Sequence, residues 1–459
     1  MKAYLGNLKT KTEKLISSFG GLNTAVSEFG LSPSESPLMQ NISAVANGAL
    51  SPCEERTVFA SADGEVQFIG VFEGKYISAV IKQSGSCYWK YYDSGWVTIC
   101  QVDESPTGRY DMLKFIDKTI LVTGKVYQVS GIEKTKSYWA RLTNGTVTSG
   151  NKTVMPAADM IETINGRICA AYTQTDKLYL GGIMDSDVWF DIADGLDENI
   201  ITQDGENGEA IAAYADHIVY LKGHSVSELY GNTPDTYKMI TVSESIGCIA
   251  GKTVCSDRSL IWLSGKGVCI YSGGAAPKVI SGKIEKYIQN LDRTRLSEAV
   301  AGTDGRRYII CLPQIGGSFI NCVLNIDTGE WFCEDTQKFV GFAKMGDVLY
   351  AATENGIYTL WQAETCPEWS WDSKVWRIAP AERENISRVN VIADIDGEMT
   401  VTCINDRGET AQETFTGGRT FAQIRLHPSF FHANDTFKLR LSGEGKCKVY
   451  AVEVKFRSA

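Results

Sequence analysis

The chain contains four histidines, the side chains that most often transfer protons or bind metals near neutral pH. His217 falls in a predicted hairpin turn and His224 in a loop, while His427 and His432 flank a predicted strand near the C-terminus. The last pair could ligate a metal ion, but no cysteine or carboxylate cluster completes a ligand set at the usual spacing. We therefore expect exposed or hydrogen-bonded histidines and no metal site.

Carboxylates are the second group that could do chemistry, and the densest acidic segment contains Asp185, Asp187, Asp191, Asp194, Asp197 and Glu198. Their spacing matches no EF-hand, so we expect a solvated loop. The stretch Asn325–Trp331, NIDTGEW, faintly resembles the aspartate turn that sialidase-type propellers repeat, but its residues also suit an ordinary β-turn. The glycine-rich stretch 273–278 lacks the spacing of a phosphate-binding loop. We predict no catalytic residue, no cofactor and no metal site, and hence no enzyme.

The composition of the 459-residue chain, with 43% hydrophobic and 22% charged residues, is typical of a globular protein. No apolar run is long enough to span a membrane, and the first residues lack the apolar core of a signal peptide. The 13 cysteines are odd in number and include no CxxC, which favours buried free thiols in a reducing cytosol. A net charge of −10 argues against a protein that grips nucleic acid, but not against an acidic wall along which DNA slides.

A repeated strand pattern organises the middle of the chain and is clearest in residues 210–274, where two copies follow each other. The tight turn between the first two strands of each copy recurs at positions 74, 117, 165, 216, 257, 304 and 346, in steps of 41 to 51 residues. Asn-Gly and Asp-Gly between alternating apolar runs indicate hairpins, and such a period is typical of a β-propeller. The repeat predicts an all-β propeller of six or seven blades, with Arg56–Ala60 supplying a strand that closes the ring.

The segments on either side of the repeat differ from it. Residues 1–55 contain Pro33, Pro37 and Pro52, which predicts an extended arm with one short helix near Glu35–Asn41. We expect this arm to lie on the body of the protein or on a partner.

Residues 366–459 show six alternating strands, which predicts a small C-terminal β-sandwich. The turns expected between its strands are Asp396-Gly397, Arg407-Gly408, Gly417-Gly418 and Gly443–Gly445. The chain is therefore predicted to have three parts: an arm over 1–55, a propeller over 56–365 and a sandwich over 366–459.

Three stretches bear on function: the arm sequence GGLNTAVSEFGLSPSESPLMQNISAVANGALSPCEER, the blade sequences IMDSDVWF, IAAYADHIVYLKGHSVSELYG and LIWLSGKGVCIYSGG, and the strand-rich end beginning at WSWDSK. In this order they resemble the β-propeller proteins of short-tailed bacteriophages that act as packaged-DNA stabilisation or tail-nozzle proteins. The resemblance covers nearly the whole chain through degenerate motifs. The arm departs from the family at Pro52-Cys53-Glu54-Glu55, where basic residues are more usual beside the arginine, here Arg56.

The resemblance implies a structural virion protein without enzymatic activity that forms a homohexameric ring, or nozzle, at the head–tail connection. Double-stranded DNA would pass through the ring without sequence-specific binding, and the ring would help retain packaged DNA and serve DNA ejection. Portal-adaptor or other tail proteins would be its partners, with assembly in the bacterial host cytoplasm and a final place in the virion tail. The arm residues that the resemblance implies for docking a partner are Leu22, Asn23, Leu31, Pro37, Asn41 and Arg56.

Two other functions stay open on the sequence. A monomeric propeller that binds other proteins on one face would explain the repeat, but it would give the arm and the sandwich no role. A glycan-binding or glycan-cleaving propeller at a tail tip would share the repeat, although the chain lacks a repeated aspartate turn.

Overall fold

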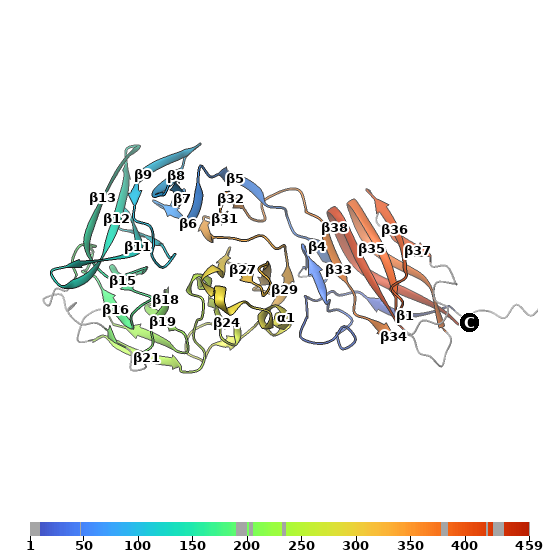
Figure 1. The fold of residues 1–459 in the computed structure, drawn as a ribbon. Helices are drawn as coiled ribbons and strands as arrows, with labels where there is room; N and C mark the ends of the chain where they lie inside the picture. The colour runs from blue at the N-terminus through green and yellow to red at the C-terminus, as the bar shows by residue number, and fades with distance from the viewer. Residues whose placement is uncertain are drawn as a thin grey trace, which may run out of the picture.

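The structure is a computed structural model that describes residues 10–45, 47–189, 200–201, 205–231, 236–377, 384–418, 421–425 and 436–458. It consists of a ring of blades with a strand-rich unit attached at one side (Figure 1). The all-β propeller that the repeat predicts is therefore confirmed.

Each blade is built from four antiparallel strands. The first four blades are β6–β9 (Glu65–Phe72, Tyr76–Gln83, Ser86–Tyr92, Trp96–Val102), β10–β13 (Asp111–Phe115, Lys118–Val129, Ile132–Thr143, Thr146–Pro156), β14–β17 (Met160–Ile164, Arg167–Ala171, Lys177–Leu180, Ile200–Ile201) and β18–β21 (Gly208–Tyr214, His217–Lys222, Val226–Tyr230, Lys238–Ser243). The others are β22–β25 (Cys255–Ser256, Leu260–Ser264, Gly267–Tyr271, Lys278–Val279), β26–β29 (Val300–Thr303, Arg307–Pro313, Phe319–Asn325, Glu330–Cys333) and β30–β32 (Gly341–Met345, Val348–Thr353, Gly356–Thr359) with β5 (Thr57–Ser61).

The first strands of the blades form a closed circle. In order, β6, β10, β14, β18, β22, β26 and β30 each contact the next, and β30 contacts β6 again. Six blades are separate four-stranded sheets in the described chain, and β26–β29, part of a larger sheet, completes a ring of seven. Every one of the seven turns predicted from the repeat connects the first and second strands of a blade.

The ring is closed by a strand from the other end of the propeller sequence. β5 pairs antiparallel with β32, so the last blade takes its outer strand from residues that precede the first blade. This confirms the closing strand predicted at Arg56–Ala60. Pairing the two ends of the propeller sequence in one sheet locks the ring, because opening it would break a strand ladder.

The helical segments in the described part of the chain are short and lie between blades: η3 (Gly251–Thr253) before β22, and η4 (Gly282–Ile284), α1 (Glu285–Gln289) and η5 (Arg293–Glu298) before β26. Among the described residues, no helix has both the length and the apolar character needed to cross a membrane.

The C-terminal unit contains β33 (Trp369–Asp372), β34 (Trp376–Arg377), β35 (Glu384–Asn405), β36 (Thr410–Thr416), β37 (Ala422–Arg425) and β38 (Thr436–Ser458). The turns predicted at Asp396-Gly397 and Gly443–Gly445 are wrong, because β35 and β38 run through them as long paired strands. A Cβ at Gly397 would lie 2.4 Å from the carbonyl oxygen of Glu444. These glycines therefore permit close approach of two backbones and do not end the strands.

The arm is woven into the rest of the fold through β1 (Thr10–Ile16), β2 (Leu38–Gln40), β3 (Ile42–Ala44) and β4 (Leu50–Pro52). β1 pairs with β38, and β2 lies between β29 of the propeller and β33 of the C-terminal unit. The helix predicted near Glu35–Asn41 is wrong. Pro37 disfavours helix at Ser36, and Leu38–Gln40 finds ladder partners on both sides, so this segment is a strand.

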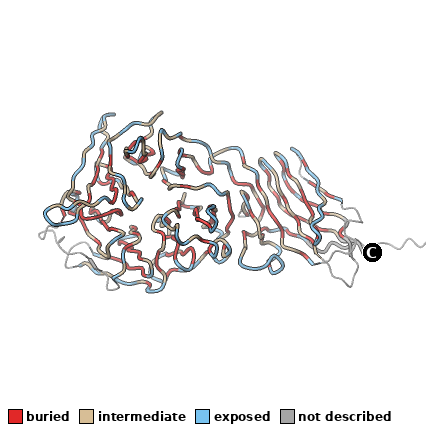
Figure 2. Tube along the Cα trace, viewed as in Figure 1, coloured by how far each residue is buried: buried red, intermediate tan, exposed pale blue. Residues whose placement is uncertain are grey.

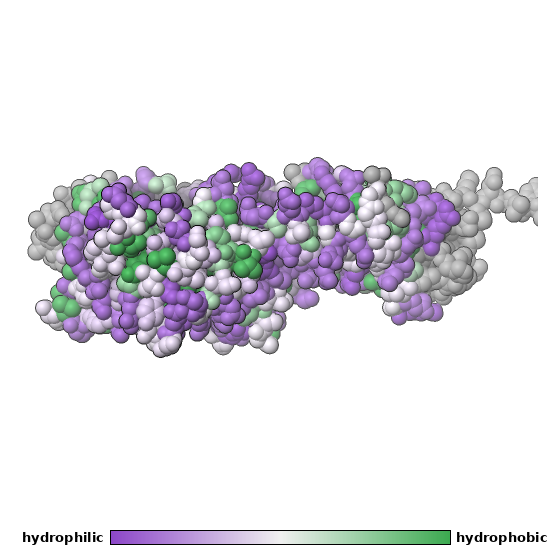
Figure 3. Space-filling model, turned by 90° about the horizontal axis from the view of Figure 1, so that it is seen from above, coloured by the Kyte–Doolittle hydropathy of each residue, from purple (hydrophilic) through white to green (hydrophobic). Residues whose placement is uncertain are grey.

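The three parts share one core. A single cluster of buried side chains includes Leu22 of the arm, Trp331 of β29 and Leu439 of β38, and Figure 2 shows buried residues on both sides of the junction between the propeller and the C-terminal unit. All thirteen cysteines are free, and all except Cys100 and Cys255 are buried. Seen from above, the C-terminal unit is mostly hydrophilic, whereas hydrophobic groups interrupt the surface of the propeller (Figure 3).

Candidate functional site

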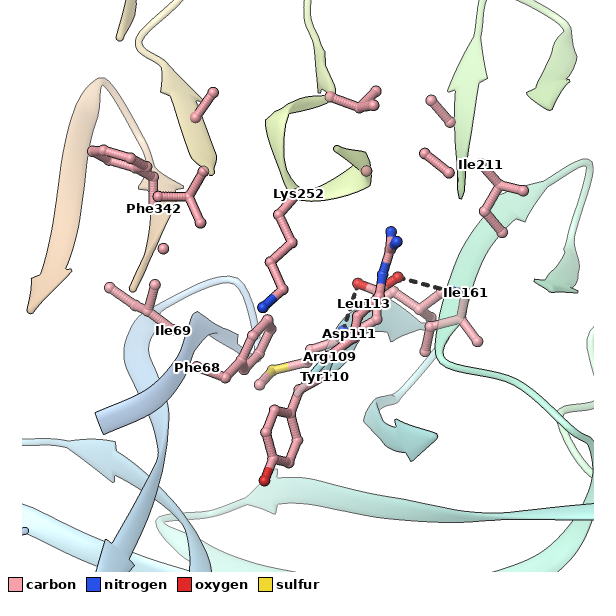
Figure 4. A pocket seen from close by; sticks show the side chains of 18 of the residues that line it. Phe68, Ile69, Arg109, Tyr110, Asp111, Leu113, Ile161, Ile211, Lys252 and Phe342 are labelled. Atoms are coloured by element: carbon pink, nitrogen blue, oxygen red, sulfur yellow. Dashed lines mark hydrogen bonds between the residues drawn. The ribbon is translucent and has the colours of Figure 1, made fainter. Parts of the chain in front are cut away.

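A cavity of about 400 Å³ lies on the propeller axis, where the first strands approach one another. Its wall includes Phe68 of β6, Asp111 of β10, Glu162 of β14, Ile211 of β18, Lys252 of η3 and Phe342 of β30. Figure 4 labels all of these except Glu162. Charged and apolar groups from different blades thus meet in one space of ligand size.

Arg109 lies in the loop before β10, where local hydrogen bonds fix its backbone. Ser105 Oγ donates to the Arg109 carbonyl at 2.7 Å and accepts the Arg109 N–H at 2.9 Å. The guanidinium Nη1 of Arg109 donates to the Glu209 carbonyl at 2.6 Å. Within the described residues Arg109 has no ion-pair partner, although its charge acts at longer range on Asp111 and Glu209, where burial raises the pKa values and Arg109 lowers them.

Lys252 approaches Arg109 from across the ring, because η3 precedes the fifth blade and Arg109 precedes the second. Its Nζ donates to the carbonyl of Gly108, the neighbour of Arg109, at 2.7 Å. Gly251 permits this approach, because a Cβ there would lie 1.9 Å from the Glu209 carbonyl oxygen and 2.5 Å from Arg109 Nη1. Burial, with a smaller contribution from Arg109, lowers the pKa of Lys252 to about 8. Lys252 likewise has no ion-pair partner in the described chain.

Two carboxyl groups face the same cavity and are held by backbone amides. Asp111 accepts the N–H of Met112 at 2.8 Å and that of Ile161 at 2.9 Å. Burial raises the pKa of Asp111 to about 7, although the Ile161 N–H and Arg109 oppose the rise. Burial also raises the pKa of Glu162 above its usual range. Both groups are thereby easier to protonate than exposed carboxylates.

A second cavity, of about 290 Å³, lies at the arm junction, by which we mean the region where the arm meets β29, β32 and the C-terminal unit. Arg56 forms an ion pair with Asp335 there and lies over the Phe339 ring at 5.1 Å. Asn41 Nδ2 donates to the Glu368 carbonyl at 2.7 Å. Two of the predicted docking residues, Asn41 and Arg56, are therefore brought together by the structure.

A second arginine of the arm junction, Arg307, also has ion-pair and aromatic partners within the chain. Arg307 forms ion pairs with Asp304 at 3.1 Å and Glu54 at 3.5 Å, and its guanidinium lies 3.9 Å from the centre of the Trp361 ring. Trp361 Nε1 donates to the buried Glu334 carboxylate at 2.6 Å. Burial raises the pKa of Glu334.

The other four predicted docking residues lie apart from this cavity. Leu22 is fully buried, and its N–H donates to the Trp331 carbonyl at 2.7 Å. Asn23 caps a turn by accepting the Ala25 N–H at 3.1 Å, and Leu31 is buried. Pro37 is half-buried just before β2. Leu22 and Leu31 therefore pack within their own chain and present little surface to a partner.

His217 begins a buried network that its sequence position did not reveal. Its Nδ1 lies 3.1 Å from Asp216 and its Nε2 lies 3.0 Å from Glu228 on β20. Glu228 also accepts hydrogen bonds from Tyr230, at 2.9 Å, and from Tyr271 of the next blade. Burial, and then the bond to Glu228, raises the pKa of Tyr230 to about 12. The prediction of a hydrogen-bonded histidine is confirmed, but the network depends on strand pairing and blade packing.

The remaining residues of the sequence analysis have structural partners or lie outside the described ranges. His224 is exposed and contacts Glu206 at 2.7 Å, and Asn325 accepts two amides of an ordinary β-turn. Asp187 forms an ion pair with Lys152. Outside the described residues lie His427, His432, Asp191, Asp194, Asp197 and Glu198. No group of three or more metal-binding side chains occurs in the part of the chain that is described.

Comparison with known proteins supplies fold likeness only. No family model matches the chain, and no curated protein matches it either. A streptogramin B lyase structure is similar at a TM-score of 0.39 and 11% identity, over 67% of this chain and 96% of that one. The propeller domain of the trilobed protease from Pyrococcus furiosus gives a TM-score of 0.38 and 10% identity, over 64% and 95%. An exo-β-1,3-galactanase from Phanerochaete chrysosporium gives a TM-score of 0.28 and 9% identity, over 77% of this chain and 96% of that one. At these values the likeness says nothing about activity.

Proposed function

We propose that this protein is a structural component of the tail of a short-tailed bacteriophage, in which copies form a homohexameric ring that continues the DNA channel. One observation carries the proposal. The arm, whose sequence bears part of the phage resemblance, is built into the fold through β1 and β2. Arm, propeller and C-terminal unit thus form one continuous scaffold with a shared core, which suits a subunit that must hold its shape in a ring.

The proposed DNA channel lies between copies and not along the propeller axis. The axial cavity of about 400 Å³ is far too small for a duplex, whose major groove alone is about 12 Å wide. The net charge of −10 supports a channel wall that repels phosphates and lets DNA move. In this proposal DNA meets surfaces of several subunits and is bound by none of them.

The test is the mass of the purified full-length chain by light scattering, together with electron micrographs of the same sample. We expect a species of six chains and a ring with six-fold symmetry around an open channel. A species that stays monomeric over a wide range of protein concentration, without rings in the micrographs, would contradict the proposal. Deleting residues 1–55 is a poor test, because Leu22 and β2 belong to the core of the chain itself.

A monomeric binding propeller is the second candidate, and the axial cavity favours it. Arg109 and Lys252 are placed on that cavity without ion-pair partners among the described residues, as a binding site would require. The same mass measurement separates the two candidates, since a binding propeller needs no ring.

A further inference from the structure

The two cations of the axial cavity are unusual in how their charge is balanced. Arg109 and Lys252 lie 143 positions apart in the chain, and each donates to a backbone carbonyl at 2.6 or 2.7 Å. Because Lys252 donates to the carbonyl of Gly108, which precedes Arg109 in the chain, the two charged groups lie in the same cavity (Figure 4). Like charges held together in a partly dry space repel each other and lose hydration, so this arrangement is costly when the cavity holds only water.

We propose that the axial cavity binds a small ligand through a compact oxyanion, a phosphate or carboxylate group, held between Arg109 and Lys252. The guanidinium offers a planar fork of donors and the ammonium offers a point charge, a combination that suits such an anion. The apolar part of the ligand lies against Phe68, Ile69 and Phe342, which line the same cavity. This binding site goes beyond the ring proposal and does not depend on it.

The carboxyl groups of the cavity fit the same ligand. Asp111 and Glu162 are hydrogen-bonded to backbone amides, so neither neutralises Arg109 or Lys252 by an ion pair. Their raised pKa values favour the protonated form, in which a carboxyl can donate a hydrogen bond to an anion and does not repel it. The positive end of the cavity is thus left for the ligand.

The dimensions limit the ligand to a small molecule. The cavity volume of about 400 Å³ lies within the range of small-ligand pockets, which runs from roughly 300 to 1,000 Å³. Neither a nucleic-acid duplex nor a folded protein domain enters such a space. Residues from all seven blades line the cavity, so a bound ligand would contact most of the ring at once.

Equilibrium dialysis of the full-length protein against radiolabelled sulfate tests the proposal, with phosphate and acetate as competitors. Sulfate keeps its charge across the pH range, so its titration does not confuse the result. We expect one saturable site per chain, and we expect Lys252→Gln and Arg109→Gln each to weaken binding about tenfold or more, the effect of losing one charge-assisted hydrogen bond. Stronger competition by phosphate than by acetate would identify a phosphate ligand, and the reverse a carboxylate.

Two variants keep the test interpretable. Lys252→Arg retains the charge and should bind within a few-fold of the original chain. Lys266→Gln removes an exposed lysine of the turn between β23 and β24 in the same blade, and it should leave binding unchanged. The absence of a saturable site, or equal loss of binding in Lys266→Gln and Lys252→Gln, would overturn the proposal. If sulfate does not bind, the expected mass of the ring stays the same, so the binding proposal can fail while the ring proposal stands.

Discussion

The axial cavity and the arm junction place cations in similar surroundings but balance them in opposite ways. At the arm junction, Arg56 pairs with Asp335 and lies over an aromatic ring. In the axial cavity, Arg109 and Lys252 donate to backbone carbonyls, and neither has an ion-pair partner in the described ranges. At the arm junction, carboxylates of the same chain therefore pair with the cation. In the axial cavity, the two cations remain available to a ligand.

This difference distinguishes a cation that stabilises the fold from a cation that is available to bind a ligand. A cation that the chain itself neutralises contributes to holding two segments together, and its removal leaves a partner unpaired. A cation without such a partner costs stability unless a ligand compensates for it. The predictions below test whether the two regions differ in this way.

The largest effect is expected at the arm. Leu22 is fully buried between the arm and β29, so Leu22→Ala should lower the free energy of unfolding by about 2–5 kcal/mol through lost burial and a cavity. Urea denaturation followed by tryptophan fluorescence measures this change. Leu15→Ala, at a side chain that is 59% exposed, is the control and should change stability by no more than about 0.5 kcal/mol. Equal effects would show that the arm is not part of the core.

A smaller effect is expected from Gly251→Ala at the axial cavity. The new Cβ would overlap the Glu209 carbonyl oxygen, so η3 and Lys252 should move away from Arg109 at a cost of about 1–3 kcal/mol. Sulfate binding should fall together with stability. Gly282→Ala, where a Cβ meets nothing within 4 Å, is the matched control in another short helix. Normal sulfate binding in Gly251→Ala would contradict the geometry of the site.

The most direct contrast uses one chemical change in both regions. Arg56→Met removes an ion-paired cation from the arm junction and should destabilise the chain by about 1 kcal/mol. Lys252→Met removes an unpaired cation and should leave the ligand-free chain unchanged or stabilise it by about 1 kcal/mol. Thermal unfolding in chloride buffer compares the two variants. Destabilisation of the same size in both would remove the distinction between the regions.

The smallest effect is the pH dependence that comes from Asp111. The pKa of Asp111 is raised to about 7 in the folded chain, so the folded chain holds this proton more tightly than the unfolded chain does. The stabilisation that comes from the protonated Asp111 is therefore complete below a pH of about 4 and is lost as the pH rises through about 7. We expect the free energy of unfolding to fall between pH 5 and pH 8 by about 1 kcal/mol or less, given that water reaches the cavity. In Asp111→Asn this fall should be smaller, with Glu162 accounting for part of the remainder. An unchanged pH slope in the variant would show that Asp111 is not the group responsible.

The sequence was sufficient for the parts of the fold that depend on short-range signals. Each blade turn is a local hairpin whose glycine or aspartate stands between alternating strands, so seven of them could be found by spacing. The closing strand could also be predicted from the sequence, because an incomplete last blade would leave a strand edge unpaired. Gly397, Gly443 and Gly445 led to wrong turn predictions, because a turn and a close approach of two backbones both select glycine.

The candidate site could not be found in this way. Arg109 lies in a loop and Lys252 in the short helix η3, neither of which carries a motif, and only ring closure brings them to one cavity. Asn41 and Arg56 were among the docking residues that the resemblance implied, but their partners Glu368 and Asp335 belong to distant segments. The partners of His217 likewise come from a neighbouring strand and the next blade. Contacts across blades depend on tertiary packing, which local patterns do not encode.

An experimental density map of the protein prepared with selenate, a sulfate analogue with a strong anomalous signal, tests the difference between the two regions most directly. We predict an anomalous peak in the axial cavity between the Arg109 guanidinium and the Lys252 ammonium, and none beside Arg56 or Arg307 at the arm junction. An empty axial cavity at saturating selenate, or a peak at the arm junction instead, would contradict the assignment of the axial cavity as the binding site.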